Sequence, residues 1–165
     1  MDHLNKWLGL IANFGVVIGI GFLAYETSLN TDALRATTAA QQTATYTGIT
    51  NEAAASPSLV DALISVNAGA PDPTSYFQAF YHASSVFKST EFSYMQWKAG
   101  NMDEELWLGT LSGHRIYVTS PFMLVGWASG IRMAVAPSFR EFMDDMIREI
   151  CAEQTCPEGG RPEDW

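Results

Sequence analysis

The stretch from Trp7 to Tyr25, WLGLIANFGVVIGIGFLAY, decides the fold class, because none of its nineteen side chains carries a charge. As an α-helix rising about 1.5 Å per residue it reaches roughly 28 Å, close to the hydrocarbon thickness of a bilayer. Trp7 and Tyr25 stand at its two ends, where interfacial aromatic residues are enriched. The stretch therefore predicts one transmembrane helix that anchors the chain.

A cleaved signal peptide is the main alternative for this N-terminal stretch. The apolar run is longer than the roughly 7 to 15 residues of a typical signal-peptide core. It is followed by Tyr25-Glu26-Thr27-Ser28-Leu29, which has no clear small-x-small cleavage pattern. A retained anchor is therefore the favoured interpretation.

The remainder of the 165-residue chain is long enough for one domain with its own core. The net charge is −9, and the nine basic residues are scattered singly from Lys6 to Arg161. Binding to a polyanion needs clustered Lys and Arg, so this composition argues against nucleic acid and against an anionic lipid surface. As partners we expect the lipid bilayer and other membrane protein subunits, with a homo-oligomer as an alternative.

The side of the membrane that the domain occupies depends on few residues. Lys6 precedes the span and Arg35 follows it, so the positive-inside rule is nearly balanced. Cys151 and Cys156 are close enough in sequence for a short disulfide, which would suit an oxidising periplasm. Two reduced thiols in the cytoplasm are the alternative, and the periplasm is slightly favoured.

The rest of the sequence predicts an all-α protein, in which the single N-terminal transmembrane helix continues into a stalk and then a small domain of about five helices. The stalk ends near Gly48 and the Ser56-Pro57 pair. It presents a shallow face at helical spacing, made of Ala33, Ala36, Ala40 and Ala44. We expect the anchor and stalk in residues 1–50, the helical domain in 51–152 and an acidic irregular tail in 153–165.

Proline, glycine and acidic capping signals divide the domain into helices over residues 57–66, 73–99, 103–118, 122–133 and 137–151. The second of these should be the core helix, since one broad stripe contains Phe77, Phe80, Tyr81, Phe87, Tyr94 and Met95. In two other helices we expect buried faces of Leu59, Leu63 and Val66, and of Trp107, Leu111 and Val118.

The last helix is expected to be amphipathic. Its buried face should contain Phe139, Phe142, Met143, Met146 and Ile150. On its wet side, Arg140/Asp144 and Asp144/Arg148 have the spacing of i,i+4 ion pairs.

Within the anchor, Gly15 and Gly19 form a G-x-x-x-G pattern, flanked on the same side by Ala12 and Phe22. Such a face lets two helix backbones approach closely. Glycine is also common in membrane helices without a partner, so a docking face and an ordinary lipid-facing helix both fit the pattern.

Glu91 and His114 are the two polar residues predicted within apolar faces. A carboxylate and an imidazole that met in a core would have shifted pKa values and could relay protons or bind a metal. The structural alternative is favoured: Glu91 pairs with Lys88 or Lys98 on its own helix, and His114 is a hydrogen-bonded core residue.

No motif for catalysis or for a cofactor is present. The three histidines have no H-x-x-x-H or E-x-x-H relation, and the two cysteines lack a second pair for a tetrahedral site. Phosphate-loop, dinucleotide and nucleophile-elbow patterns are absent from the sequence. We therefore assign no catalytic, cofactor-binding or metal-ligating residue and expect no enzyme.

Several stretches resemble a broad group of uncharacterised bacterial proteins with one N-terminal transmembrane helix and a helical extramembrane domain. They are LIANFGVVIGIGFLAYE (10–26), Asn30-Thr31, Ala33-Leu34-Arg35-Ala36, MDEELW (102–107), Ser120-Pro121 with Trp127, and SFREFMDDM (138–146). The resemblance implies this architecture and a bacterial inner membrane, but no mechanism. The chain departs from the group at residues 26–28, where basic residues are more usual and would favour a cytoplasmic domain.

Together these features predict a non-catalytic accessory or scaffolding subunit of a larger membrane complex. A homo-oligomeric, membrane-anchored regulatory protein that senses a small apolar ligand is the first alternative. An enzyme that uses Glu91 and His114 is the less favoured one.

Overall fold

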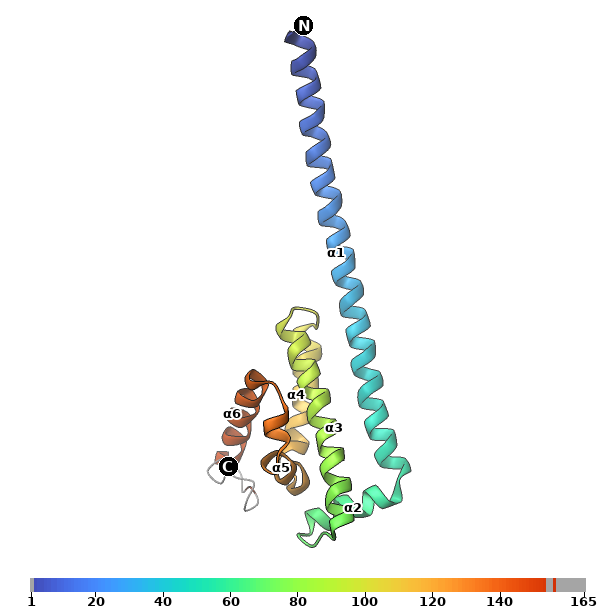
Figure 1. Cartoon of the computed structure of the whole chain (residues 1–165), viewed down its shortest axis with the longest axis vertical. Coiled ribbons are helices and arrows are strands. Elements are labelled where there is room, and N and C mark those ends of the chain that lie inside the picture. The colour runs from blue at the N-terminus through green and yellow to red at the C-terminus, as the bar shows by residue number, and fades with distance from the viewer. Residues whose placement is uncertain (1, 154–155, 157–165) are drawn as a thin grey trace. The chain divides into compact units, whose positions relative to one another are not determined.

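A computed structural model of the chain describes residues 2–153 and Cys156 (Figure 1). It confirms the all-α class, since the described residues contain helices and no strand. A long first helix precedes five further α-helices and one short 3-10 helix. The elements are α1 (Asp2–Ala55), α2 (Pro57–Asn67), α3 (Pro73–Lys98), α4 (Glu104–Val118), α5 (Pro121–Ala128), η1 (Ile131–Ala134) and α6 (Pro137–Glu153).

The chain divides into two units, one up to Thr37 and one from Thr38 onward. The predicted boundaries after residues 50 and 152 stay predictions, and the predicted tail lies outside the described residues except for Glu153 and Cys156. In the first unit α1 is long and apolar enough to cross a membrane, and its most apolar window has 0% of its residues buried. This unit therefore contains one candidate membrane span.

The sequence predicted that this segment ends near Gly48 and the Ser56-Pro57 pair; helix α1 continues past Gly48 and stops at Ala55, directly before that pair. A glycine inside a helix costs only about 1 kcal/mol relative to alanine, which neighbouring residues can offset. Pro57 ends α1, since a proline disfavours the helical conformation of the residue before it. Ser56 is accordingly extended, with φ −112° and ψ 95°, and its Oγ accepts a hydrogen bond from the backbone N–H of Leu59 at 3.3 Å.

Helix α2 begins as the sequence predicted and buries Leu59, Ala62 and Val66. It packs against α3, which in turn contacts α4, α5 and α6 (Figure 1). Helix α3 is therefore the central helix of the second unit.

The buried face of α3 differs from the predicted aromatic stripe. Phe87 and Tyr94 are buried, but Phe77, Tyr81 and Met95 are 57%, 67% and 44% exposed. Small residues, Ala79 and Ala83, take much of the core face instead. At Gly126 of α5 an added Cβ would lie only 3.1 Å from Cβ of Ala83, so small side chains on both helices allow the close approach of α3 and α5.

The buried faces predicted for α4 and α6 are confirmed. Trp107 and Val118 of α4 are buried, with Leu111 packed against the core. Helix α6 buries Phe139, Met143, Met146 and Ile150, with Phe142 partly buried against the same cluster. Aromatic rings join the two helices to α3; for example, the rings of Trp97 and Trp107 stack with centroids 5.5 Å apart.

The single helix predicted over residues 122–133 is interrupted. Helix α5 ends at Ala128, and after Gly130, whose φ is +148°, the chain turns into η1. A side chain would strain the backbone at that angle, so glycine permits the turn. The turn places Arg132 beside α6.

The ion pairs predicted for Asp144 are wrong. Asp144 is buried rather than wet, and its carboxylate accepts hydrogen bonds from Nε and Nη2 of Arg132 at 3.0 and 2.7 Å and from Nε1 of Trp127 at 3.0 Å. Arg148 instead pairs with the exposed Asp145 at 2.6 Å. Partners from α5 and η1, which spacing along α6 does not reveal, decide where this carboxylate points.

Candidate functional site

The second unit contains a cavity of about 300 Å³ between the last part of α1 and the helices α2 to α5. A volume of this size is at the lower end of the usual range for small-molecule sites. None of the described residues that line it is an aspartate, glutamate, lysine or arginine. Its wall consists of Gln42, Tyr46, Ile49, Thr50, Ala53, Leu63, Asn67, His82, Val86, Ser89, Thr90, Thr110, Gly113, His114, Tyr117, Phe122 and Met123.

His114 is the most deeply buried titratable residue of this wall, with 5% of its surface exposed. Its Nδ1 lies 3.0 Å from Oγ1 of Thr90, and its ring meets that of Phe87 edge-on at 5.3 Å between centroids. Burial lowers the pKa of His114 to about 4, so the imidazole is neutral at pH 7. Its other nitrogen, Nε2, is buried and has no hydrogen-bond partner among the described residues.

The proton on His114 can be assigned from its neighbour. Oγ1 of Thr90 lies 3.0 Å from the backbone oxygen of Val86, one turn earlier in α3, and donates its single proton there. It can then only accept from the imidazole, so Nδ1 of His114 carries the ring proton and Nε2 is left as an acceptor. This assignment follows from the hydrogen-bond network rather than from observed hydrogens.

Gln42 is another buried polar residue of the wall, 5% exposed, and its Oε1 also lacks a partner among the described residues. A buried polar atom without a hydrogen bond costs about 1–3 kcal/mol, so two such atoms on residues that line one cavity call for an explanation. An apolar cavity with a few converging polar atoms is the usual form of a ligand site.

Two tyrosines of the wall link α1 to α4. Burial and a hydrogen bond with Tyr117 raise the pKa of Tyr46. Both side chains are about half exposed, at 47% and 48%, so they stand where the cavity meets the surface. On α3, burial lowers the pKa of His82, an effect that the negative charge of Glu52 partly opposes.

Sequence reasoning singled out His114 but missed Gln42, Tyr46 and Thr90. A signal was present, since Thr38, Gln42, Tyr46, Ile49 and Ala53 recur at spacings of three and four. On this face Thr38 and Gln42 are buried, whereas Ala40 and Ala44, on the alanine face that we expected to pack, are exposed. The alanine face was predicted to pack because its side chains are small. The domain packs instead against the neighbouring face that contains Thr38 and Gln42.

The possible pair of Glu91 and His114, the less favoured of the two interpretations, does not form, because each residue has its own partners. The carboxylate of Glu91 accepts hydrogen bonds from Nζ of Lys88 at 2.8 Å and from the backbone N–H of Ala136. Nζ of Lys88 also donates to the backbone oxygen of Ala134. The predicted ion pair between Glu91 and Lys88 is therefore confirmed. The two side chains also hold the connection between η1 and α6 in place.

The residues predicted for docking lie on the exposed surface of the first unit. Within the described chain, nothing lies within 4 Å of a Cβ added at Gly15 or Gly19, and Ala12 and Phe22 are exposed. The interfacial aromatics Trp7 and Tyr25 are 64% and 62% exposed. All six side-chain positions are therefore open to lipid or to another helix.

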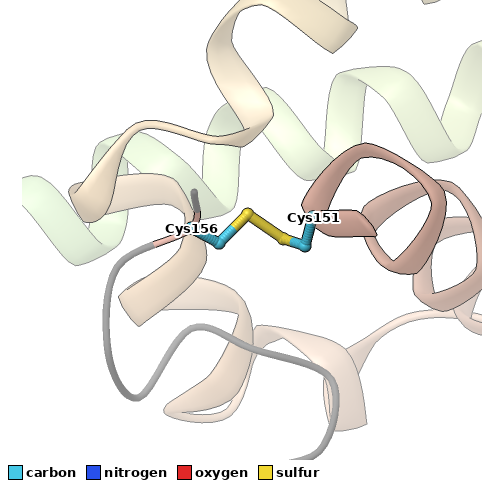
Figure 2. The surroundings of a disulfide bond; sticks show 2 residues. All are labelled: Cys151 and Cys156. Carbon is cyan, nitrogen blue, oxygen red and sulfur yellow. A yellow bond between two sulfur atoms is a disulfide. The ribbon is translucent and has the colours of Figure 1, made fainter. Parts of the chain in front are cut away.

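Cys151 and Cys156 are joined by a disulfide, with their Cα atoms 5.4 Å apart (Figure 2). Cys151 lies in the last turn of α6, and Cys156 is buried in the core cluster at 4% exposure. The bond therefore holds Cys156, beyond the end of α6, against the core. Among the described residues no group of three or more His, Cys, Asp or Glu side chains is placed to hold a metal ion.

Comparison with protein-family models, with curated protein sequences and with solved structures finds no match. The resemblance to the bacterial single-span proteins therefore stays a prediction, and any function must be argued from the geometry of the cavity.

Proposed function

We propose that this protein is a membrane-anchored regulatory or sensing protein that binds a small apolar ligand in the cavity of its helical domain. The observation that carries this proposal is the pair of buried, unpartnered atoms, Nε2 of His114 and Oε1 of Gln42, on two residues that line a mainly apolar cavity with no charged side chain among its described residues. A ligand that reached these atoms would relieve their desolvation and would bury apolar surface of its own.

Binding without catalysis fits this site best. Nothing in the described residues positively indicates a reaction. Nδ1 of His114 is bonded to the hydroxyl of Thr90 rather than to a carboxylate, so no negative charge stabilises the imidazolium that a general base must form. Among the described residues, the ionisable side chains of the wall are two histidines and two tyrosines.

The test uses two glycines one turn apart on α4. Gly113 lines the cavity, whereas Gly109 is exposed and does not, and a Cβ added at either position meets nothing within 4 Å. We expect Gly113→Leu to fill the cavity and Gly109→Leu to leave it open. Calorimetry with propylbenzene on the full chain in lipid nanodiscs should detect saturable binding to the wild type and to Gly109→Leu but not to Gly113→Leu. Equal heats for all three proteins would mean partition into lipid only and would refute the proposal.

An accessory or scaffolding subunit of a larger membrane complex is the second candidate function. It is favoured by the open Gly15/Gly19 face, onto which a second membrane helix could pack closely. Mass spectrometry after mild detergent extraction would detect unrelated subunits if this candidate is correct, and only copies of the same chain if the protein is a homo-oligomer. Replacing Gly15 and Gly19 with Ile should abolish either assembly; an unchanged band on a native gel would rule out this face.

We further propose that the anchor lies in a bacterial inner membrane with the domain in the periplasm, and that the chain belongs with the bacterial single-span proteins that it resembles. The disulfide supports the periplasm, since such bonds persist in oxidising compartments. An impermeant alkylating reagent applied to intact cells should label the two cysteines after reduction and not before it. Labelling that requires cell lysis would place the domain in the cytoplasm.

A further inference from the structure

We infer that the ligand is an uncharged, mainly apolar molecule of about ten non-hydrogen atoms whose hydroxyl group donates a hydrogen bond to Nε2 of His114. This inference rests on the proposed function and names the ligand class of the same cavity. It is carried by four features of the wall: its volume, its lack of charge, the tautomer of His114 and the second acceptor on Gln42.

The volume sets the size of the ligand. A cavity of about 300 Å³, at roughly 30 Å³ for a water-sized atom and its share of space, holds about ten non-hydrogen atoms. Medium-length alcohols and small alkylphenols have this size. A long lipid chain or a large cofactor would extend out of the cavity.

The lack of charged side chains among the described residues of the wall determines the net charge of the ligand. No described residue of the wall offers an ion pair to a carboxylate, a phosphate or an ammonium group. Moving an unpaired charge out of water into such a site is strongly unfavourable. A neutral ligand is therefore required.

The hydrogen-bonding atoms set the functional group. Nε2 of His114 is an acceptor because Nδ1 donates to Thr90, and Oε1 of Gln42 is an acceptor as well. Two neighbouring hydroxyls of the wall are used elsewhere, since Thr50 and Thr110 donate to backbone oxygens of their own helices. These two acceptors thus lack a donor, and ethers, ketones and quinones do not provide one.

A hydroxyl fits better than an N–H group for a further reason. It donates one hydrogen bond and can accept others, whereas an N–H group only donates. A site whose acceptor would otherwise remain buried and unpaired discriminates strongly against analogues without the hydroxyl.

The test compares three probes of nearly equal size: 4-propylphenol, its methyl ether 4-propylanisole, and propylbenzene. Each is titrated into the full chain in nanodiscs, with Gly113→Leu protein as the reference for partition into lipid. We expect the wild type to bind 4-propylphenol about tenfold more tightly than 4-propylanisole. Equal affinity for the two would overturn the inference, because it would mean that water alone satisfies the buried acceptors.

The His114→Phe variant assigns the acceptor. We expect it to lose the tenfold preference for the phenol over the anisole, and a circular dichroism spectrum like that of the wild type would show that the domain is folded. A preference that survives in this variant would overturn the role of His114. If none of the three probes binds to the wild type, the proposed function itself fails; if all three bind equally, only the hydroxyl assignment fails.

Discussion

Replacing Asp144 with alanine is expected to destabilise the helical domain by about 2–3 kcal/mol, because its carboxylate serves two partners at once. The oxygens accept hydrogen bonds from Nε1 of Trp127 at 3.0 Å and from the guanidinium of Arg132, the shortest at 2.7 Å. Trp127 is fully buried, and the side chain of Asp144 is 11% exposed. The bonds to Asp144 raise the pKa of Arg132, so the guanidinium stays charged.

The magnitude follows from what each partner loses. Without the carboxylate, the indole N–H of Trp127 is buried with no acceptor, at a cost of about 1–3 kcal/mol. The side chain of Arg132 is 32% exposed, so water replaces part of its bonds and its loss is about 1 kcal/mol or less. Alanine is a better helix former than aspartate by roughly 0.5 kcal/mol, which offsets a little of the sum.

Urea unfolding of the full chain in detergent, followed by circular dichroism, measures this change. The matched control is Asp145→Ala on the same helix, since Asp145 and its partner Arg148 are 68% and 62% exposed. We expect Asp145→Ala to change stability by less than about 0.5 kcal/mol. The reasoning is refuted if the two variants are equally stable, or if Asp144→Ala costs as much in a Trp127→Phe background, where no indole N–H is left unpaired.

Four further predictions concern other residues of the domain. The folded pKa of His114, about 4, lies below its ordinary 6.5, so its contribution to stability is complete above about pH 6.5 and is lost as the pH falls toward 4. The loss should be on the order of 3 kcal/mol in a pH series of urea titrations, and a His114→Gln variant should lack this component. Replacing both Cys151 and Cys156 with Ser should destabilise the domain by about 2 kcal/mol, because the unfolded chain loses a covalent loop; identical urea midpoints with and without the bond would contradict this. Gly109→Ala should stabilise the domain by about 0.5–1 kcal/mol, since the position is an open helix interior. Gly126→Ala should destabilise it by about 1 kcal/mol or more, since its Cβ would lie 3.1 Å from Cβ of Ala83; thermal melts that shift in the same direction for both would show that the α3–α5 contact can relax.

Features that depend on neighbours in the chain could be predicted from the sequence. The apolar run from Trp7 to Tyr25, the cap at Ser56 with Pro57, and the amphipathic face of α6 all follow from periodicity and local backbone preference. The break after Ala128 was missed, because a short helix followed by a 3-10 turn has no distinct hydrophobic period.

The candidate site shows the same division. His114 stood out as a polar residue on an apolar face, but its partner Thr90 is 24 positions away in sequence. Gln42 and Tyr46 belong to a helical face with few apolar residues. The sequence therefore predicted that the adjacent alanine face would pack. The cavity itself is bounded by five helices, and no single one of them indicates a void.

Helix positions, caps and the candidate span are consequences of local sequence, because backbone hydrogen bonds and the 3.6-residue period involve only residues a few positions apart. The burial of Asp144, the separate partners of Glu91 and His114, and the uncharged cavity depend on how the helices pack. Each requires groups from different helices to meet, and the desolvation of a polar atom is determined only when its surroundings are in place.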